Sequence, residues 1–385
     1  MYKPERVCNL SNRWPACSEG EENEMKKSMM LRDINSALEH LRIKASSRKV
    51  DGSVVVSRTP ERGVSGSSKE RDRIKQAEAA LIKKLQLQVA KLETLHQGSR
   101  AVFLKGDIPT KAGKQCMVFK FFGEELVREQ SQEIRAMLDV EALGDAAKQS
   151  LYIARWLKDD AFTEHGAICN EFVPFRWADM LAMPRPCALL LRAQAMLLLQ
   201  TLSTLHKAGI AHGSFCIDKV LLSHGLVPHL VDFSCCSTEG VKQKTPAQLS
   251  DLDLRFLPSE LRAELKLKQR VEMSLERAKT LDMYAFGASL YLAFFELPQT
   301  SLTGLPDLSK LSFKARDLKS FSKSAQRSLE DLINKLLGSE KTRLRADAAL
   351  RHDFFAGLAA SSQPRRHLHL YQALCQQADT AGRDL

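Results

Sequence analysis

Segment 187–206, CALLLRAQAMLLLQTLSTLH, is the most apolar stretch of the chain and constrains the fold more than any other. Arg192, Gln194 and Gln200 interrupt it, and no run of eighteen apolar residues occurs, so we expect no transmembrane helix. The segment is predicted to be a buried or half-buried helix, which requires a large core around it. A chain of 385 residues with 44% hydrophobic and 27% charged residues can supply that core.

Charge and cysteine usage narrow the classes of function. The formal net charge is +11, a balance that favours nucleic acid, anionic lipid or acidic proteins as partners. The basic residues are spread along the chain and mixed with acids, so nucleic acid is not the partner we expect. The nine cysteines are odd in number and form no CxxC pair, which argues against a zinc site or a disulfide framework and suits a reducing compartment.

The N-terminal part of the chain differs in composition from the rest. Residues 1–68 are polar and broken by Gly, Ser and Pro, so we expect a mostly disordered tail, within which residues 29–45 have helical periodicity and fold or dock. Residues 69–88 are predicted to form a helical extension. Its basic amphipathic part, 69–84, packs on the following domain or, as the alternative, binds a membrane. The first residues hold no apolar stretch typical of a signal peptide, which predicts a cytoplasmic protein.

Beyond residue 88 the pattern changes from strands to helices. Residues 89–175 contain three strand-like runs and one helix. The runs are 101–106, 115–122 and 166–175, and the helix is 124–140. Residues 176–360 are almost all helical in pattern, and residues 361–385 form a C-terminal tail. The sequence therefore predicts an α+β fold of two lobes, a small β-rich lobe with one helix and a larger, mainly α-helical lobe, with a cleft between them.

Short motifs occur along both predicted lobes. They are HQGSRAV (96–102), MVFK (117–120), SQEIRAM (131–137), NEFVP (170–174), HGSFCIDK (212–219), DFS (232–234), FLPSEL (256–261), DMYAFG (282–287) and RLRADAALRHDFF (343–355). In this order, over about residues 89–356, they resemble the motifs of the protein kinase superfamily in a degenerate form. The resemblance implies a bilobal protein kinase-like fold.

The resemblance also implies a nucleotide site between the lobes. Lys120 would hold phosphates and pair with Glu133 on the helix, while Asp232 would bind Mg²⁺. The stretch that holds Glu171 and Val173 resembles the hinge that joins the lobes and hydrogen-bonds adenine through its backbone.

The loop that would cover the phosphates is degraded. Gly98 and Val102 keep the family pattern, but His96 and Ala101 replace two glycines, and their side chains hinder a close approach of phosphate. The residues leave two hypotheses open, weak ATP binding with Mg²⁺ at Asp232 and metal-independent ATP binding. No other cofactor is indicated.

The catalytic loop has lost its chemical groups. His212 remains, and its family role is structural, but Ser214 replaces the base, and serine cannot accept a proton at neutral pH as a carboxylate can. Cys216 replaces the lysine that steadies the transferred phosphate. Lys219 replaces a metal-binding asparagine and places a cation where one Mg²⁺ would lie. Lys120 and Lys219 together would neutralise phosphates without two metals.

The downstream motifs concern the activation segment, where the resemblance implies a buried ion pair between Glu260 and Arg343. The segment 261–280 is longer than usual and is interpreted as an inserted, charged helix that serves as a docking surface. The HGxF form of the loop is similar to that of the rhoptry pseudokinases of apicomplexan parasites. That narrower resemblance implies a secreted, rhoptry or host-cell protein if the N-terminus is misassigned.

Three hypotheses of function follow. The first is a pseudokinase, catalytically impaired, that acts as a scaffold or allosteric regulator by binding another protein, such as an active kinase or its substrate. The second is an active but atypical serine/threonine kinase that uses Lys120 and Asp232 to hold Mg·ATP. The third is a basic nucleic-acid or lipid binder.

Overall fold

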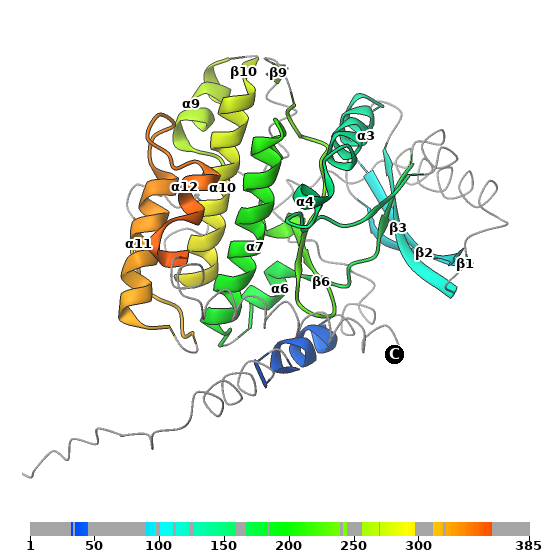
Figure 1. Cartoon of the computed structure of the whole chain (residues 1–385), viewed down its shortest axis with the longest axis horizontal. Helices are drawn as coiled ribbons and strands as arrows, with labels where there is room; N and C mark the ends of the chain where they lie inside the picture. The colour runs from blue at the N-terminus through cyan, green and yellow to red at the C-terminus, as the bar shows by residue number, and fades with distance from the viewer. Residues whose placement is uncertain are drawn as a thin grey trace, which may run out of the picture.

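A computed structural model of the chain describes residues 32–33, 35–44, 90–97, 101–110, 113–122, 127–158, 167–183, 185–238, 242–244, 256–268, 270–296, 311–318 and 321–355. Within these residues an antiparallel sheet with one long helix lies at one end, and a group of helices lies at the other (Figure 1). The predicted α+β class is confirmed at this level.

The larger sheet has five strands, all antiparallel, in the order β1-β2-β3-β5-β4. Their bounds are β1 Ala90–Gln97, β2 Ala101–Thr110, β3 Gly113–Phe122, β4 Trp156–Leu157 and β5 Ala167–Glu171. Three predicted strands are confirmed as β2, β3 and β5. The sequence pattern missed β4, which is two residues long, and β1, whose AKLETLHQ is too polar for a strand signal.

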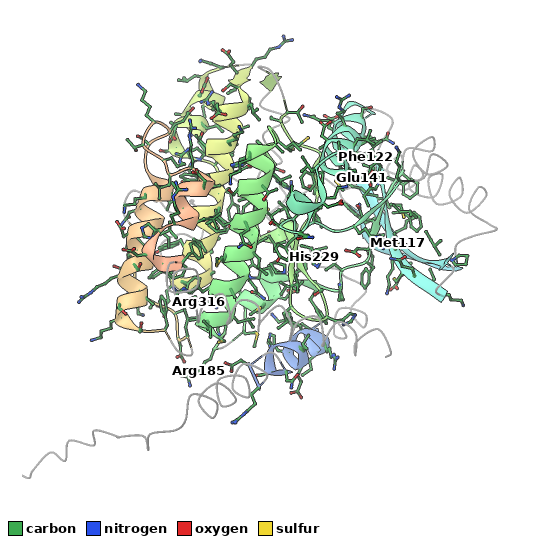
Figure 2. The ribbon with its side chains drawn as sticks, in the orientation of Figure 1. Met117, Phe122, Glu141, Arg185, His229 and Arg316 are labelled. Carbon is green, nitrogen blue, oxygen red and sulfur yellow. The ribbon has the colours of Figure 1, made fainter. Side chains whose placement is uncertain are left out.

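Strand β3 occupies the centre of the sheet and divides its side chains between two faces. Met117, Phe119 and Phe121 are buried on one face, where they pack with Leu104 of β2 in a small apolar cluster. Because side chains alternate along a strand, Lys120 points to the opposite face. Figure 2 labels Met117 near the middle of β3 and Phe122 at its end.

The helix that accompanies the sheet is α3, Val127–Glu141, close to the predicted bounds. Its buried side chains include Glu133, Ala136, Met137 and Val140, spaced as the residues of one helical face. The apolar members join the main core of the molecule. Glu133 therefore lies on the buried face of α3 because of its position in the sequence, and it needs a partner there.

The helical part is built around α7, Ala188–Lys207, the segment that the sequence singled out. The other elements are α4 Asp145–Lys148, α6 Trp177–Leu181, α9 Ser259–Leu267, α10 Leu275–Phe294, α11 Lys323–Leu337 and α12 Ala346–Leu350, with the one-turn helix η2 Ile217–Lys219. A three-stranded sheet of β6 Phe175–Arg176, β7 Val220–Leu222 and β8 Pro228–Leu230 lies beside them.

By length and composition α7 is apolar enough to cross a membrane, yet 78% of its most apolar window is buried in the structure. Helices α10 and α12 pack against it. Gln194 of α7 is satisfied inside the core, since it accepts a hydrogen bond from Trp177 Nε1 at 2.9 Å and donates one to the carbonyl of Leu226 at 3.0 Å. Helix α7 is therefore a core helix of the described part of the chain.

The segment 261–280 is not one inserted helix, so that prediction is wrong. Helix α9 ends at Leu267, strand β10 (Val271–Met273) follows, and α10 begins after Ser274, whose Oγ accepts a hydrogen bond from the Arg277 amide at 3.2 Å. Strand β10 pairs with β9, Lys242–Lys244. Val271 and Met273 are buried, and this alternation with Glu272, together with the Ser274 cap, outweighs the helical propensity of the charged residues.

Residues 35–44 form a helix that docks on the helical part, near the bottom of Figure 1. Ala37, Leu38 and Leu41 are buried in the main core. A small, partly open pocket with room for about one water is lined by this helix, by Met180 of α6 and by Leu190 of α7. The docking predicted within the 1–68 tail is thus present. The remainder of that tail, the extension before β1 and the 361–385 tail lie outside the described residues.

Candidate functional site

A cluster of four charged side chains lies where β3, α3 and the helical part meet. Lys120 Nζ donates to Glu133 Oε2 and to Asp232 Oδ1, each at 2.6 Å. Lys219 Nζ lies 2.8 Å from Asp232 Oδ2. The cluster joins segments more than a hundred residues apart, and the sequence predicted all four members as site residues.

Asp232 is the centre of the cluster, and both of its carboxylate oxygens are engaged. Ser234 Oγ adds a hydrogen bond to Oδ1 at 2.7 Å. The backbone of Asp232 has φ 68°, a left-handed conformation that costs a residue with a Cβ about 1 kcal/mol. The two ion pairs stabilise that conformation.

The charges in the cluster shift one another's protonation. Burial alone would raise the pKa of Asp232, but the ammonium groups of Lys120 and Lys219 outweigh burial and hold that pKa well below its ordinary value. Burial lowers the pKa of Lys219, and Asp232 reverses this and raises it. Burial raises the pKa of Glu133, which the Lys120 ammonium offsets only in part. Asp232 and both lysines are therefore charged at neutral pH.

The residues of the predicted catalytic loop lie beside this cluster. Ser214 Oγ accepts a hydrogen bond from Lys219 Nζ at 2.5 Å, so the predicted base position is occupied by a hydroxyl that pairs with an ammonium group. Cys216 is buried, and burial raises the pKa of its thiol to about 11. It is therefore a neutral thiol and no nucleophile at neutral pH.

His212 holds the loop in place. Its ring Nε2 lies 3.0 Å from the carbonyl oxygen of Val231, and its ring packs edge to face on Phe233 with centroids 4.9 Å apart. Burial, assisted by Lys219, lowers the pKa of His212 to about 4, so the ring is neutral. The carboxylate of Asp282 on α10 accepts hydrogen bonds from the backbone amides of His212 and Gly213, at 2.8 and 2.7 Å. Gly213 has φ 74°, which favours glycine.

The other described residues that are predicted to bind a nucleotide make no hydrogen bond or ion pair with the four charged side chains. Val102 is half-buried on β2, and Val173 is buried. Glu171, at the end of β5, accepts a hydrogen bond from the Arg155 amide at 3.0 Å. Its Oε1 also lies 3.9 Å from Nδ1 of His229, a residue that Figure 2 labels near its centre. Gly98 lies outside the described residues.

The donor set at Asp232 does not fit a divalent metal. A hard cation such as Mg²⁺ needs several oxygen ligands, whereas the groups that face Asp232 here are two ammonium groups and one hydroxyl. Across the part of the chain that the structure describes, no group of three or more His, Cys, Asp or Glu is placed to hold a metal ion.

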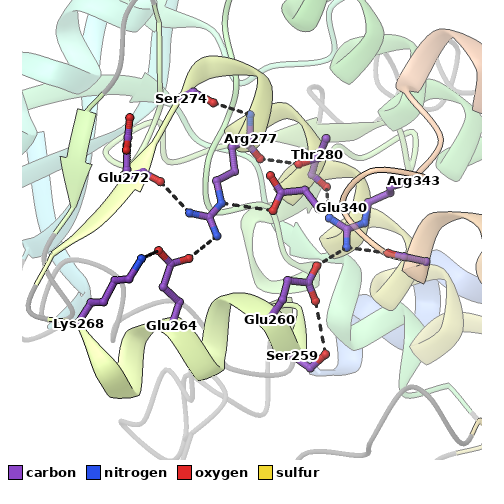
Figure 3. Close-up of polar contacts among 11 residues, drawn as sticks. Ser259, Glu260, Glu264, Lys268, Glu272, Ser274, Arg277, Thr280, Glu340 and Arg343 are labelled. Atoms are coloured by element: carbon purple, nitrogen blue, oxygen red, sulfur yellow. Dashed lines mark hydrogen bonds and ion pairs between the residues drawn. The ribbon is translucent and has the colours of Figure 1, made fainter.

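A second polar network fixes α9 to the helical part (Figure 3). Arg343 pairs with Glu260 at 2.9 Å and also donates to the carbonyl of Gly338 at 2.8 Å. The Arg343 side chain is 1% exposed but that of Glu260 is 39% exposed, so the predicted buried pair is buried on one side only. The contribution of this ion pair to the free energy of unfolding is therefore closer to that of a surface ion pair.

Arg277, which the sequence did not single out, is the other centre of this network. It contacts Glu264 at 2.5 Å and Glu340 at 3.4 Å, and donates to the carbonyl of Glu272 at 2.8 Å. It thereby links α9, β10 and the loop after α11. An arginine near a strand and an acidic helix carries no distinctive sequence signal, because the pairing depends on the turn at β10.

Comparison with known protein families and with curated proteins gives no match to this chain. The relationship to protein kinases therefore stays a prediction that rests on the motifs and on the contacts described above.

Proposed function

We propose that this protein is a pseudokinase: a bilobal, protein kinase-like chain that does not transfer phosphate and acts by binding another protein, an active kinase or its substrate. The observation that carries the proposal is the cluster around Asp232. Lys120, Glu133 and Asp232 are in contact, while Ser214 Oγ, at the position that the motifs assign to the base, accepts a hydrogen bond from Lys219 Nζ.

The arrangement of elements supports the kinase-like part of the proposal. A five-stranded antiparallel sheet with helix α3 precedes a mainly helical part, in the order that the resemblance implies. The contacts Lys120–Glu133 and Glu260–Arg343 join residues that the motifs paired. Asp282, a residue of the DMYAFG motif, bonds the loop that contains His212.

The chemistry of the site supports the loss of phosphate transfer. Enzymatic phosphate transfer depends on positioning and on charge stabilisation by metal ions and cations. Here a hydroxyl replaces the carboxylate base, and Lys219 pairs with the carboxylate that would bind a metal. In the described site, the substrate hydroxyl therefore has no carboxylate to accept its proton, and a metal-bound nucleotide has no free carboxylate to bind its metal ion.

Phosphate transfer by the full chain tests this proposal. The protein would be incubated with Mg·ATP and a basic acceptor protein, next to an active protein kinase as positive control and the Asp232→Asn variant. We expect wild type and variant to give the same background incorporation. Incorporation by wild type that Asp232→Asn abolishes would overturn the proposal in favour of an atypical kinase that uses Lys120 and Asp232.

A further inference from the structure

The carboxylate of Asp232 is shared between two lysines from different parts of the chain. Lys120 of β3 contacts Oδ1 at 2.6 Å and Lys219 of η2 contacts Oδ2 at 2.8 Å. The side chain of Lys120 is 6% exposed and that of Lys219 is 21% exposed, so both pairs are largely shielded from water. Shielding strengthens their attraction and makes their separation costly.

Lys219 is also held in position independently of Asp232. It lies on a one-turn helix between the catalytic loop and β7, and its ammonium group donates to Ser214 Oγ at 2.5 Å. The amide of Val231, the residue before Asp232, donates to the carbonyl of Lys219 at 3.0 Å. The backbone and side chain of Lys219 thus both connect the loop to the segment that contains Asp232.

We propose that the Lys219 ammonium group is a built-in cation that takes the place of a divalent metal at Asp232, so that this site keeps its shape without metal. The inference rests on the proposed kinase-like site. It adds that the site keeps one arrangement at all times and does not need a metal-bound nucleotide to form. A divalent cation would have to displace an ammonium group from Oδ2 while a second one remains on Oδ1, and like charges oppose this.

The charge of the cluster has a consequence for nucleotides. Lys120 is paired with Glu133 and with Asp232, and Lys219 is paired with Asp232. The two lysines are therefore not a surplus of positive charge available to phosphates.

Binding of Mn²⁺ alone to the full chain tests the assignment, because Mn²⁺ takes oxygen ligands and is detected directly by its paramagnetism. Lys219→Asn replaces the ammonium group, which only donates, by an amide with an acceptor oxygen. That oxygen and Asp232 Oδ2 could then both bind one metal ion. We expect wild type and Asp232→Asn to bind Mn²⁺ equally weakly. We expect Lys219→Asn to gain one site at least tenfold tighter, and the double variant Lys219→Asn/Asp232→Asn to lose it.

Lys268→Asn is the matched control, because Lys268 also contacts a carboxylate, that of Glu264 at 2.9 Å, but its side chain is 61% exposed. It should bind Mn²⁺ as wild type does. A wild-type site that Asp232→Asn weakens tenfold overturns the inference, and this comparison holds even if the Lys219 variants do not fold. Folded Lys219→Asn and Lys219→Gln proteins that both gain no site overturn it as well.

The two proposals fail in different ways. Phosphate transfer by the wild-type chain would overturn the proposed function. Mn²⁺ at Asp232 of the wild-type chain, without phosphate transfer, would overturn only the assignment of Lys219 as a built-in cation.

Discussion

At the scale of single residues, the ionisable side chains of the site make hydrogen bonds and ion pairs that hold the structure together. His212 is the clearest case. Its ring is fully buried, it bonds the Val231 carbonyl, and it packs on Phe233, the residue that follows Asp232. A buried neutral histidine resists protonation, so it links the stability of the loop to pH.

We predict that the protein loses stability as pH falls from 6.5 towards 4 because of His212. Burial lowers the pKa of His212 in the folded chain to about 4, whereas the unfolded chain has the ordinary value of about 6.5. The unfolded state therefore binds more protons in this window, and the stabilisation, complete above pH 6.5, is lost as pH falls to 4. The full difference corresponds to about 3 kcal/mol.

Urea unfolding of wild type and His212→Gln at pH 7, 6 and 5 measures this effect. The glutamine amide can still donate to the Val231 carbonyl but does not titrate in this range. We expect the stability of the variant to depend less steeply on pH than that of wild type. Parallel pH profiles for the two proteins would show that His212 is not the group responsible.

At the scale of elements, the packing of α10 on α11 depends on one small residue. A Cβ atom placed on Gly287 of α10 would lie 2.7 Å from the Cβ of Leu336 on α11, closer than packed atoms approach. The two helices are therefore in close contact at this point, within the core that also contains α7.

We predict that Gly287→Ala destabilises the protein by about 1–3 kcal/mol, since the added methyl group would push two buried helices apart. Gly144→Ala is the matched control, because a Cβ on Gly144 meets nothing within 4 Å. Thermal unfolding should show a lowered melting temperature for the first variant and little change for the second. Equal melting temperatures would contradict the close contact of α10 and α11.

The elements also show which parts of the fold the sequence could predict. Strands β2, β3 and β5 and helices α3 and α7 were predictable because their apolar residues follow a strand or helix period. The break at β10 was not, since Val271 and Met273 are buried in a cluster with Ala211, Leu257 and Leu261, and the strand pairs with β9 about 30 residues earlier in the chain. Local pattern favours a helix there, and a long-range contact decides otherwise.

At the scale of the whole molecule, the candidate site could be predicted residue by residue but not as a set of bonds. Lys120, Glu133, Lys219 and Asp232 were each singled out by motif position. That Lys219 and Lys120 share the carboxylate of Asp232 depends on the rotamers and on the left-handed backbone at Asp232, which no motif encodes. That Lys120 and Lys219 neutralise phosphates stays a prediction, in which a phosphate would compete with the carboxylates that the two lysines contact.

The position of the N-terminal helix provides a prediction for the molecule as a whole. Residues 35–44 pack on the helical part, and Leu41 is 1% exposed while Ile43 is 63% exposed. If this helix belongs to the same cooperative unit as α7, truncating its buried face must lower the stability of the entire core. We predict that Leu41→Ala costs about 2 kcal/mol, at the low end for a buried leucine because the helix is peripheral.

Chemical denaturation of the full chain, followed by tryptophan fluorescence, distinguishes the possible results. Trp177 of α6 is fully buried in the core that contains Leu41, so its emission reports on that region. Leu41→Ala should shift the single transition to lower denaturant concentration, while Ile43→Ala, which removes exposed side-chain atoms from the same helix, should leave it in place. An unchanged midpoint for Leu41→Ala would mean that the core is stable without the packing of the N-terminal helix.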